Sequence, residues 1–360
     1  MKIGKFFIRS IIVGLWIFLF YAIITLPHWI KPASQNSPVL NVFSWPEVLC
    51  PETIQRFEKE TGIKIKRHYY TTNEELLVKL KSTNGNGYDL IIPSDYMVKK
   101  LIQEELVAPL DLQKLHFIDV LNPKLTNQEF DPHNRYSIPY TWDAIGFGIN
   151  TADFVQTPFE PNWKTIFSAQ DPQKKISMIN DPIEAIDVSA RYLFGNQKEF
   201  SAKETQLIAS ILKQQKPFVE SYSGVRGDYL LITKNCSIAV IPASYVLRGG
   251  KNYSHIDFKL PKEYTFLSIE NFCLVQNSPN QDFAYTFLNY IYQEEVIANE
   301  ANLYCNFPAI TNVKSYINSS ALFNKTYDAL ENYDGILYFT RDLLSEKEAR
   351  TLWIELKSTR

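Results

Sequence analysis

The sequence has 360 residues, of which 45% are apolar, 21% charged and 14% aromatic, and its formal net charge is −2 at pH 7. This length and composition predict two globular domains with buried cores and exclude an intrinsically disordered chain. The balanced charge, and the lack of a Lys/Arg stripe with interleaved aromatic residues, exclude a nucleic-acid-binding protein.

Cysteine and histidine spacing gives no sign of a metal site. The four cysteines show no CxxC pair and the five histidines are scattered, so we expect neither a metal nor another cofactor. One or two disulfides and four buried thiols both remain open, because pairing cannot be deduced from spacing. The cysteines are Cys50, Cys236, Cys273 and Cys305.

Residues 1–30 indicate where the rest of the chain resides. Three basic residues, Lys2, Lys5 and Arg9, precede a continuous apolar run, IIVGLWIFLFYAIITL, over residues 11–26. Because basic flanks stay on the cytoplasmic side, everything that follows is expected to be exported. A cleaved signal peptide and an uncleaved membrane anchor both fit this segment, and the sequence leaves the two open.

After a linker at residues 31–37, short apolar strands alternate with amphipathic helices. This order predicts a parallel sheet with crossover helices, and hence an α/β fold. Asn73 and Asp95 are expected to be the N-caps of the second and third helices. Strands are expected at 39–43, 63–69 and 89–92, and helices at 51–61, from Asn73 onward, and from Asp95 to about 106.

The run YSIPYTWDAIGFGIN at residues 136–150 is strand-like but too long for one ordinary strand. We therefore expect it to cross between two lobes. A second α/β region follows it. Its expected helices are 163–167, 183–194, 202–215, 280–298 and 343–356, and its expected strands are 176–179, 236–241 and 272–275.

Signatures of enzymes are missing from the sequence. It contains no GxSxG, GxxxxGK[ST] or HExxH motif, and its paired glycines lack the rest of a dinucleotide fingerprint. Asp181 and Glu184 are a carboxylate pair of the kind that glycosidases use. Lying three residues apart on one helical turn, they point the same way and cannot easily flank a bond. We therefore expect a protein that is not an enzyme.

Four segments of the first half carry a resemblance to a known family. Trp45-Pro46-Glu47 ends the first strand, and it is followed by FEKETGIKI at 57–65, YDLIIPSDYMVKKL at 88–101 and FDPHNRYSIPYTWDAIGFGIN at 130–150. In this order and spacing they resemble the first lobe of the spermidine/putrescine-binding periplasmic proteins of polyamine ABC transporters, which are bacterial extracellular solute-binding proteins. NDPIEAIDVSARYLFG at 180–195 and NLYCNFPA at 302–309 extend the resemblance more weakly.

The resemblance implies a type II periplasmic-binding-protein fold, in which two lobes, each a mostly parallel sheet flanked by helices, close over a ligand by hinge motion. Lobe 1 would comprise 38–143 and about 271–310, and lobe 2 about 144–270 and 311–360. It also implies a periplasmic monomer that captures a polyamine or similar small cation and delivers it to an inner-membrane ABC permease. Membrane contact would be confined to the N-terminal segment. The alternative is a degenerate family member, a membrane-anchored sensor or a binder of another cationic solute.

A polyamine cleft needs carboxylates for the ammonium groups and aromatic walls for the methylene chain. Asp181 and Glu184 also fit an alternative assignment as a helix cap and capping box, and Ser94 as a residue that begins a helix. The resemblance assigns ligand binding to Trp45, Glu47, Ser94, Tyr96, Asp181, Glu184, Glu270 and Tyr304.

Two departures from the family pattern leave the particular polyamine open. Tryptophans are expected near Pro242 and Ser268, and neither position is aromatic. Tyr245, Tyr222 and Phe266 are the aromatic residues that stand as possible substitutes. The acids still favour a cationic solute.

Overall fold

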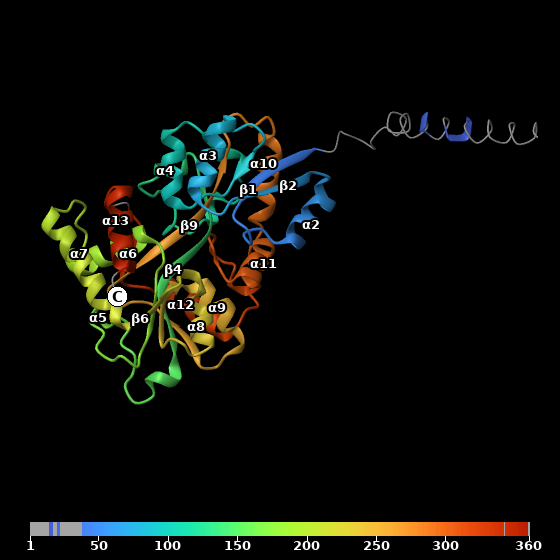
Figure 1. Cartoon of the computed structure of the whole chain (residues 1–360). Coiled ribbons are helices and arrows are strands. Elements are labelled where there is room, and N and C mark those ends of the chain that lie inside the picture. Colours follow the sequence, from blue (N-terminus) through green and yellow to red (C-terminus); the bar gives the residue numbers. More distant parts are fainter. Residues whose placement is uncertain (1–13, 17–19, 22–37, 342, 359–360) are drawn as a thin grey trace, which may run out of the picture.

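The computed structural model describes residues 14–16, 20–21, 38–341 and 343–358 and shows a chain of two lobes (Figure 1). Most of the apolar run at 11–26, and the expected linker at 31–37, lie outside these residues. Within the described stretches, no helix is both long enough and apolar enough to cross a bilayer. The described strands join in one sheet that continues through both lobes in the order β2-β1-β3-β9-β4-β7-β5-β6.

The first lobe begins with the parallel strands that the sequence predicts. β1 pairs in parallel with β2 on one side and with β3 on the other, which confirms the expected crossover order. Proline at the start of α2 and Gly62 after its end, with a left-handed φ of 75°, give this helix its predicted bounds. The elements are β1 (Val39–Ser44), α2 (Pro51–Thr61), β2 (Lys64–Tyr69), α3 (Asn73–Thr83), β3 (Leu90–Ile91), α4 (Asp95–Gln103), α10 (Gln281–Ile291), α11 (Glu294–Tyr304) and β10 (Phe307–Pro308).

Two long strands, β4 (Ile138–Asn150) and β9 (Tyr264–Leu274), run through both lobes (Figure 1). The first half of β4 pairs with β9, and its second half pairs with β7 and β8 of the other lobe. The predicted crossing by the 136–150 run is therefore confirmed. A second crossing near 270 was implied by the expected lobe bounds, but the strand that makes it was predicted only in part. Ser268, Glu270 and Asn271 interrupt the apolar pattern of β9, so that only 272–275 was expected to be a strand.

The second lobe surrounds the far halves of β4 and β9. Its β5 pairs in parallel with both β6 and β7. The elements are α5 (Trp163–Phe167), β5 (Ile176–Met178), α6 (Pro182–Phe194), α7 (Ala202–Gln215), β6 (Val219–Tyr222), α8 (Gly227–Ile232), β7 (Ile238–Pro242), α9 (Ala243–Gly249), β8 (Ile256–Lys259), α12 (Ala321–Glu331), β11 (Ile336–Phe339) and α13 (Glu346–Ser358).

Three expectations about local structure were wrong. Thr72, not Asn73, caps α3, and its side chain accepts from the N–H of Glu75. Asp95 is the first residue of α4 and Ser94 occupies the cap position. The helix expected at 280–298 is two helices, α10 and α11, because the chain adopts an extended φ/ψ at Gln293 between them.

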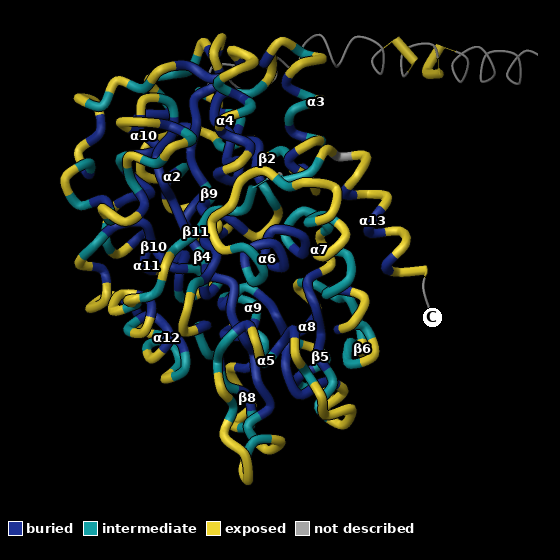
Figure 2. The backbone as a smooth tube through the Cα atoms, turned by 90° about the vertical axis from the view of Figure 1, so that its left-hand side faces the viewer, coloured by how far each residue is buried: buried dark blue, intermediate teal, exposed yellow. Residues whose placement is uncertain are grey.

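Buried residues concentrate along the central strands, as Figure 2 shows for β4 and β9. One apolar cluster extends from the first lobe through Trp142 and Ile269 to Val246 of α9, so the two lobes share a continuous core at the crossing. All four cysteines are buried and unpaired. Of the two alternatives that the sequence left open, the structure therefore has free thiols and not disulfides.

Candidate functional site

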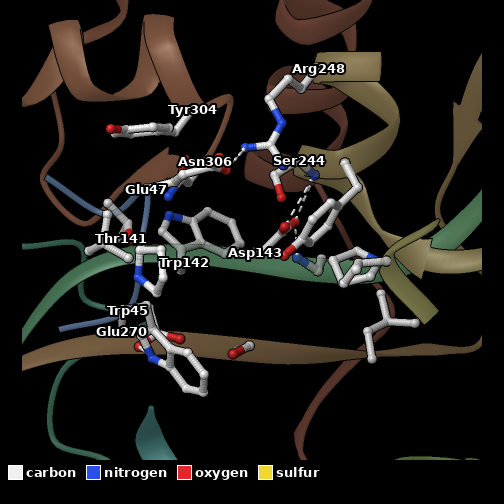
Figure 3. A pocket seen from close by; sticks show the side chains of 18 of the residues that line it. Trp45, Glu47, Thr141, Trp142, Asp143, Ser244, Arg248, Glu270, Tyr304 and Asn306 are labelled. Carbon is white, nitrogen blue, oxygen red and sulfur yellow. Dashed lines mark hydrogen bonds and ion pairs between the residues drawn. The ribbon is translucent and has the colours of Figure 1, made fainter. Parts of the chain in front are cut away.

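A cavity of about 470 Å³ lies between the lobes, where the loop after β1, the crossing strands and the start of α9 meet (Figure 3). Five of the eight predicted site residues line it: Trp45, Glu47, Glu184, Glu270 and Tyr304. The other three, Ser94, Tyr96 and Asp181, lie outside its lining. Four of the lining residues are acids and one, Arg248, is basic.

Glu270 on β9 is held by two neutral donors from the first lobe. The indole Nε1 of Trp45 donates to Oε2 over 2.9 Å, and the hydroxyl of Ser94 donates to Oε1 over 2.8 Å. Ser94 is 6% exposed and its hydroxyl is engaged by Glu270, and ligand binding by Ser94 stays a prediction. Burial, reinforced by the charge of Asp95, raises the pKa of Glu270 to about 8.

Asp181 and Glu184, at the start of α6, make different contacts. The carboxylate of Asp181 caps the helix by accepting from the N–H groups of Ile183 (2.8 Å) and Glu184 (3.0 Å). The side chain of Glu184 lines the cavity and does not close a capping box. Burial first, and then the charges of Asp181, Asp95 and Asp187, raise its pKa to about 8. Ligand binding by Asp181 stays a prediction.

Glu47 and Arg248 meet across the cleft. Nη1 of Arg248 on α9 donates to Oε2 of Glu47 over 3.1 Å, and the dashed line in Figure 3 marks this ion pair. Glu47 has a φ of 58°, a left-handed conformation that is unfavourable for a residue other than glycine. The loop after β1 therefore holds this acid in a strained backbone at the edge of the cavity.

Asp143 on β4 is a lining acid to which the sequence assigned no role. Both its oxygens accept from the N–H of Ser244 at the start of α9, at 3.1 and 3.3 Å, and Oδ1 also accepts from the N–H of Ala144 at 2.7 Å. Burial raises its pKa to about 6, and the hydrogen bonds oppose that rise. Its carboxylate is thus already occupied by backbone donors.

Aromatic rings form part of the wall. Trp45 packs on Tyr70 with ring centroids 4.7 Å apart, and the hydroxyl of Tyr304 donates to the carbonyl of Leu49 over 3.3 Å. Trp142, also in the wall, is 3% exposed and donates to the carbonyl of Pro308, so it is mainly a core residue of the crossing. Tyr96 is 37% exposed on α4 near Asp181 and Glu270, whose charges add to the burial that raises its pKa.

Pro242 and Ser268, the positions where tryptophans were expected, both line the cavity. Of the three aromatic substitutes considered, Tyr245 shares this lining. Phe266 is 1% exposed in the core of the second lobe, and Tyr222 packs against Trp353. The wall at these two positions therefore carries no indole.

The fold and the cavity define a two-lobed solute-binding protein. The model of the bacterial extracellular solute-binding protein family matches residues 52–327, well over half of the chain, and the chain belongs to this family.

Relatives and solved structures agree with this assignment. The chain is 28% identical over 267 residues to the spermidine/putrescine-binding periplasmic protein of Escherichia coli, covering 73% of this chain and 75% of the relative. It is 26% identical over 352 residues to the putrescine-binding periplasmic protein SpuD of Pseudomonas aeruginosa, covering 90% and 93%. The substrate-binding protein PotD of a Streptococcus pneumoniae spermidine/putrescine ABC transporter superposes with a TM-score of 0.76 at 23% identity, covering 89% and 99%. The expected type II fold is confirmed.

Sequence reasoning missed several lining residues, namely Thr141, Ser244, Arg248 and Asn306. No local sequence pattern indicated these four residues. They line the cavity only because the two lobes face each other, and the residues next to them in the sequence do not reveal that contact. The position of Arg248 on α9, in a helix that was not predicted, gave no signal at all.

Proposed function

We propose that this protein is the substrate-binding component of a bacterial ABC importer, which captures a polyamine or related small organic cation between its lobes and delivers it to an inner-membrane permease. Membership of the family supports the importer role, and relatives named for spermidine and putrescine binding support the ligand class. The observation that carries the proposal is the pair Glu184 and Glu270. Among the described residues, neither of these cavity acids has an ion-pair partner.

A cationic ligand supplies the missing partner charges. An ammonium group beside each carboxylate would make charge-assisted hydrogen bonds and favour the ionised acids, which burial disfavours in the empty cleft. Trp45 and Tyr304 offer apolar ring faces for the methylene chain between the ammonium groups. Ser94 acts through Glu270, whose carboxylate it orients.

Closure of the lobes is proposed to occur at the two crossings. Lobe 1 then comprises 38–143 and about 271–310, and lobe 2 about 144–270 and 311–360. These bounds follow the pairing, since β4 passes from β9 to β7 near 144 and β9 passes from β11 to β3 between 267 and 273. We further propose that these lobes lie in the periplasm and act as a monomer, with residues 11–26 as signal or inner-membrane anchor. Catalysis is not part of the proposal, because Asp181, the partner acid that hydrolysis by Glu184 would need, is engaged as a helix cap.

Titration calorimetry tests the proposal. The full-length chain, purified in mild detergent, is titrated separately with putrescine, cadaverine, spermidine and spermine. We expect saturable heat with at least one of them, and no heat with any of the four would contradict the proposal.

A variant links the binding to the cavity. Glu184→Gln should weaken binding by more than about tenfold, because a charge-assisted hydrogen bond is lost, with little change in the melting temperature without ligand. Glu199→Gln, a change at an exposed glutamate of the same lobe, serves as the matched control and should leave affinity unaltered. A large fall in the ligand-free melting temperature of Glu184→Gln would instead point to a structural role.

A further inference from the structure

The edge of the cavity contains a cation of the protein's own. Arg248 belongs to the second lobe and Glu47 to the first, and their ion pair spans the cleft (Figure 3). The guanidinium of Arg248 also lies 5.1 Å from the centroid of the Tyr245 ring, so two contacts keep it at the cavity wall. The guanidinium of Arg248 therefore occupies the place beside Glu47 that a ligand ammonium group would otherwise take.

The four lining acids differ in how their charge is already satisfied. Glu47 is paired with Arg248, and Asp143 accepts three hydrogen bonds from backbone N–H groups. Glu270 has two neutral donors, Trp45 and Ser94, and no cation beside it. Within the described residues, the side chain of Glu184 makes no hydrogen bond and no ion pair, and only its backbone N–H donates, to Asp181. Two acids, Glu184 and Glu270, therefore remain for ligand ammonium groups.

We propose that Arg248 is a resident cation that occupies Glu47 and thereby restricts this cleft to diamines, ligands with two ammonium groups. This inference rests on the proposed function. A third ammonium, as in a triamine, would find no free carboxylate among the acids that line the cavity and would meet the like charge of Arg248 at the cavity edge. The non-aromatic Pro242 and Ser268 agree with this, because they offer no ring face that could stabilise a further cation.

The first test is the ratio of affinities for spermidine and putrescine, measured by calorimetry on the full-length chain. The wild type should bind putrescine at least about tenfold more tightly than spermidine. Arg248→Gln should shift the ratio toward spermidine by about tenfold, since it frees Glu47 and removes the repelling charge. Arg56→Gln is the matched control, because Arg56 is also a surface arginine in ion pairs, with Glu60 and Glu295, but lies outside this cavity.

Two further variants separate charge from space. Arg248→Lys keeps the positive charge and should keep the preference for putrescine. The double variant Glu47→Gln/Arg248→Gln should lose the gain in spermidine binding, because the freed carboxylate is absent. A gain that persists in the double variant, or that also occurs with lysine, would show that added space is responsible and would overturn the inference.

The outcomes also distinguish this inference from the proposed function. Wild-type protein that binds spermidine as tightly as putrescine, or a ratio unchanged in Arg248→Gln, would overturn the role of Arg248 while polyamine capture stands. Absence of heat with every amine in the wild type and all variants would overturn both.

Discussion

Ligand capture by this protein should be coupled to proton release. Burial and the neighbouring charges of Asp181, Asp95 and Asp187 raise the pKa of Glu184 to about 8, and burial with Asp95 raises that of Glu270 to the same value. A cation favours the ionised carboxylate, so it must displace the protons that these acids hold at pH 7. The coupling can therefore be tested by measuring ligand affinity while the pH is changed from 6 to 8.

The magnitude follows from these two pKa values. At pH 7 an acid with a pKa of about 8 is only about one tenth ionised, and ionising it costs about 1.4 kcal/mol. Two such acids together lower the affinity by about a hundredfold relative to fully ionised carboxylates. At pH 8 each is about half ionised, so the affinity should rise by about thirtyfold between pH 7 and pH 8.

Calorimetry at pH 7 in two buffers of different ionisation enthalpy counts the protons. The heat should depend on the buffer, with close to two protons released per putrescine in the wild type and about one in Glu184→Gln. Asp95, whose pKa burial raises to about 7, also titrates in this range, and Asp95→Asn should make the pH dependence shallower. Burial and the charge of Glu270 raise the pKa of Tyr70 well above 10, so Tyr70 does not titrate between pH 6 and pH 8 and adds no proton to this count. Heat independent of the buffer, with a flat affinity from pH 6 to pH 8, would refute the reasoning.

Three further predictions concern the stability of the ligand-free chain. Because the folded pKa values of Glu184 and Glu270 lie above their ordinary value of 4.5, the folded chain binds more protons between pH 4.5 and about 8. Its melting temperature should therefore fall as pH rises through this window, and a rise would contradict the shifts. Asp181→Ala should cost about 1 kcal/mol in urea unfolding through loss of the α6 cap, and unchanged stability would argue against capping. Asp187→Ala leaves the guanidinium of Arg191 buried without its 3.0 Å partner, and should lower the free energy of unfolding by about 3–5 kcal/mol, whereas a loss below about 1 kcal/mol would show that water reaches this site.

Local signals in the sequence determined the first lobe. The bounds of α2 were predicted to the residue, because a proline at its start and a glycine after its end act within one helical turn. In the second lobe, the expected bounds of α5 and α7 also agree with the structure to the residue. The resemblance then brought together five of the residues that line the cavity, among them Trp45 and Tyr304.

Tertiary structure alone decided how the acids of the site are used. Trp45 and Glu270 are 225 positions apart, and Glu47 and Arg248 are 201 apart, so neither pair leaves a periodic trace in the sequence. The spacing of Asp181 and Glu184 fitted both a ligand pair and a helix cap. In the structure the carboxylate of Asp181 caps α6, whereas the side chain of Glu184 lines the cavity. The physical reason is the distance along the chain over which each effect acts. Propensity and capping act over a few residues, whereas the charge that an acid meets across a cleft depends on which strands cross between the lobes and how the two lobes face each other.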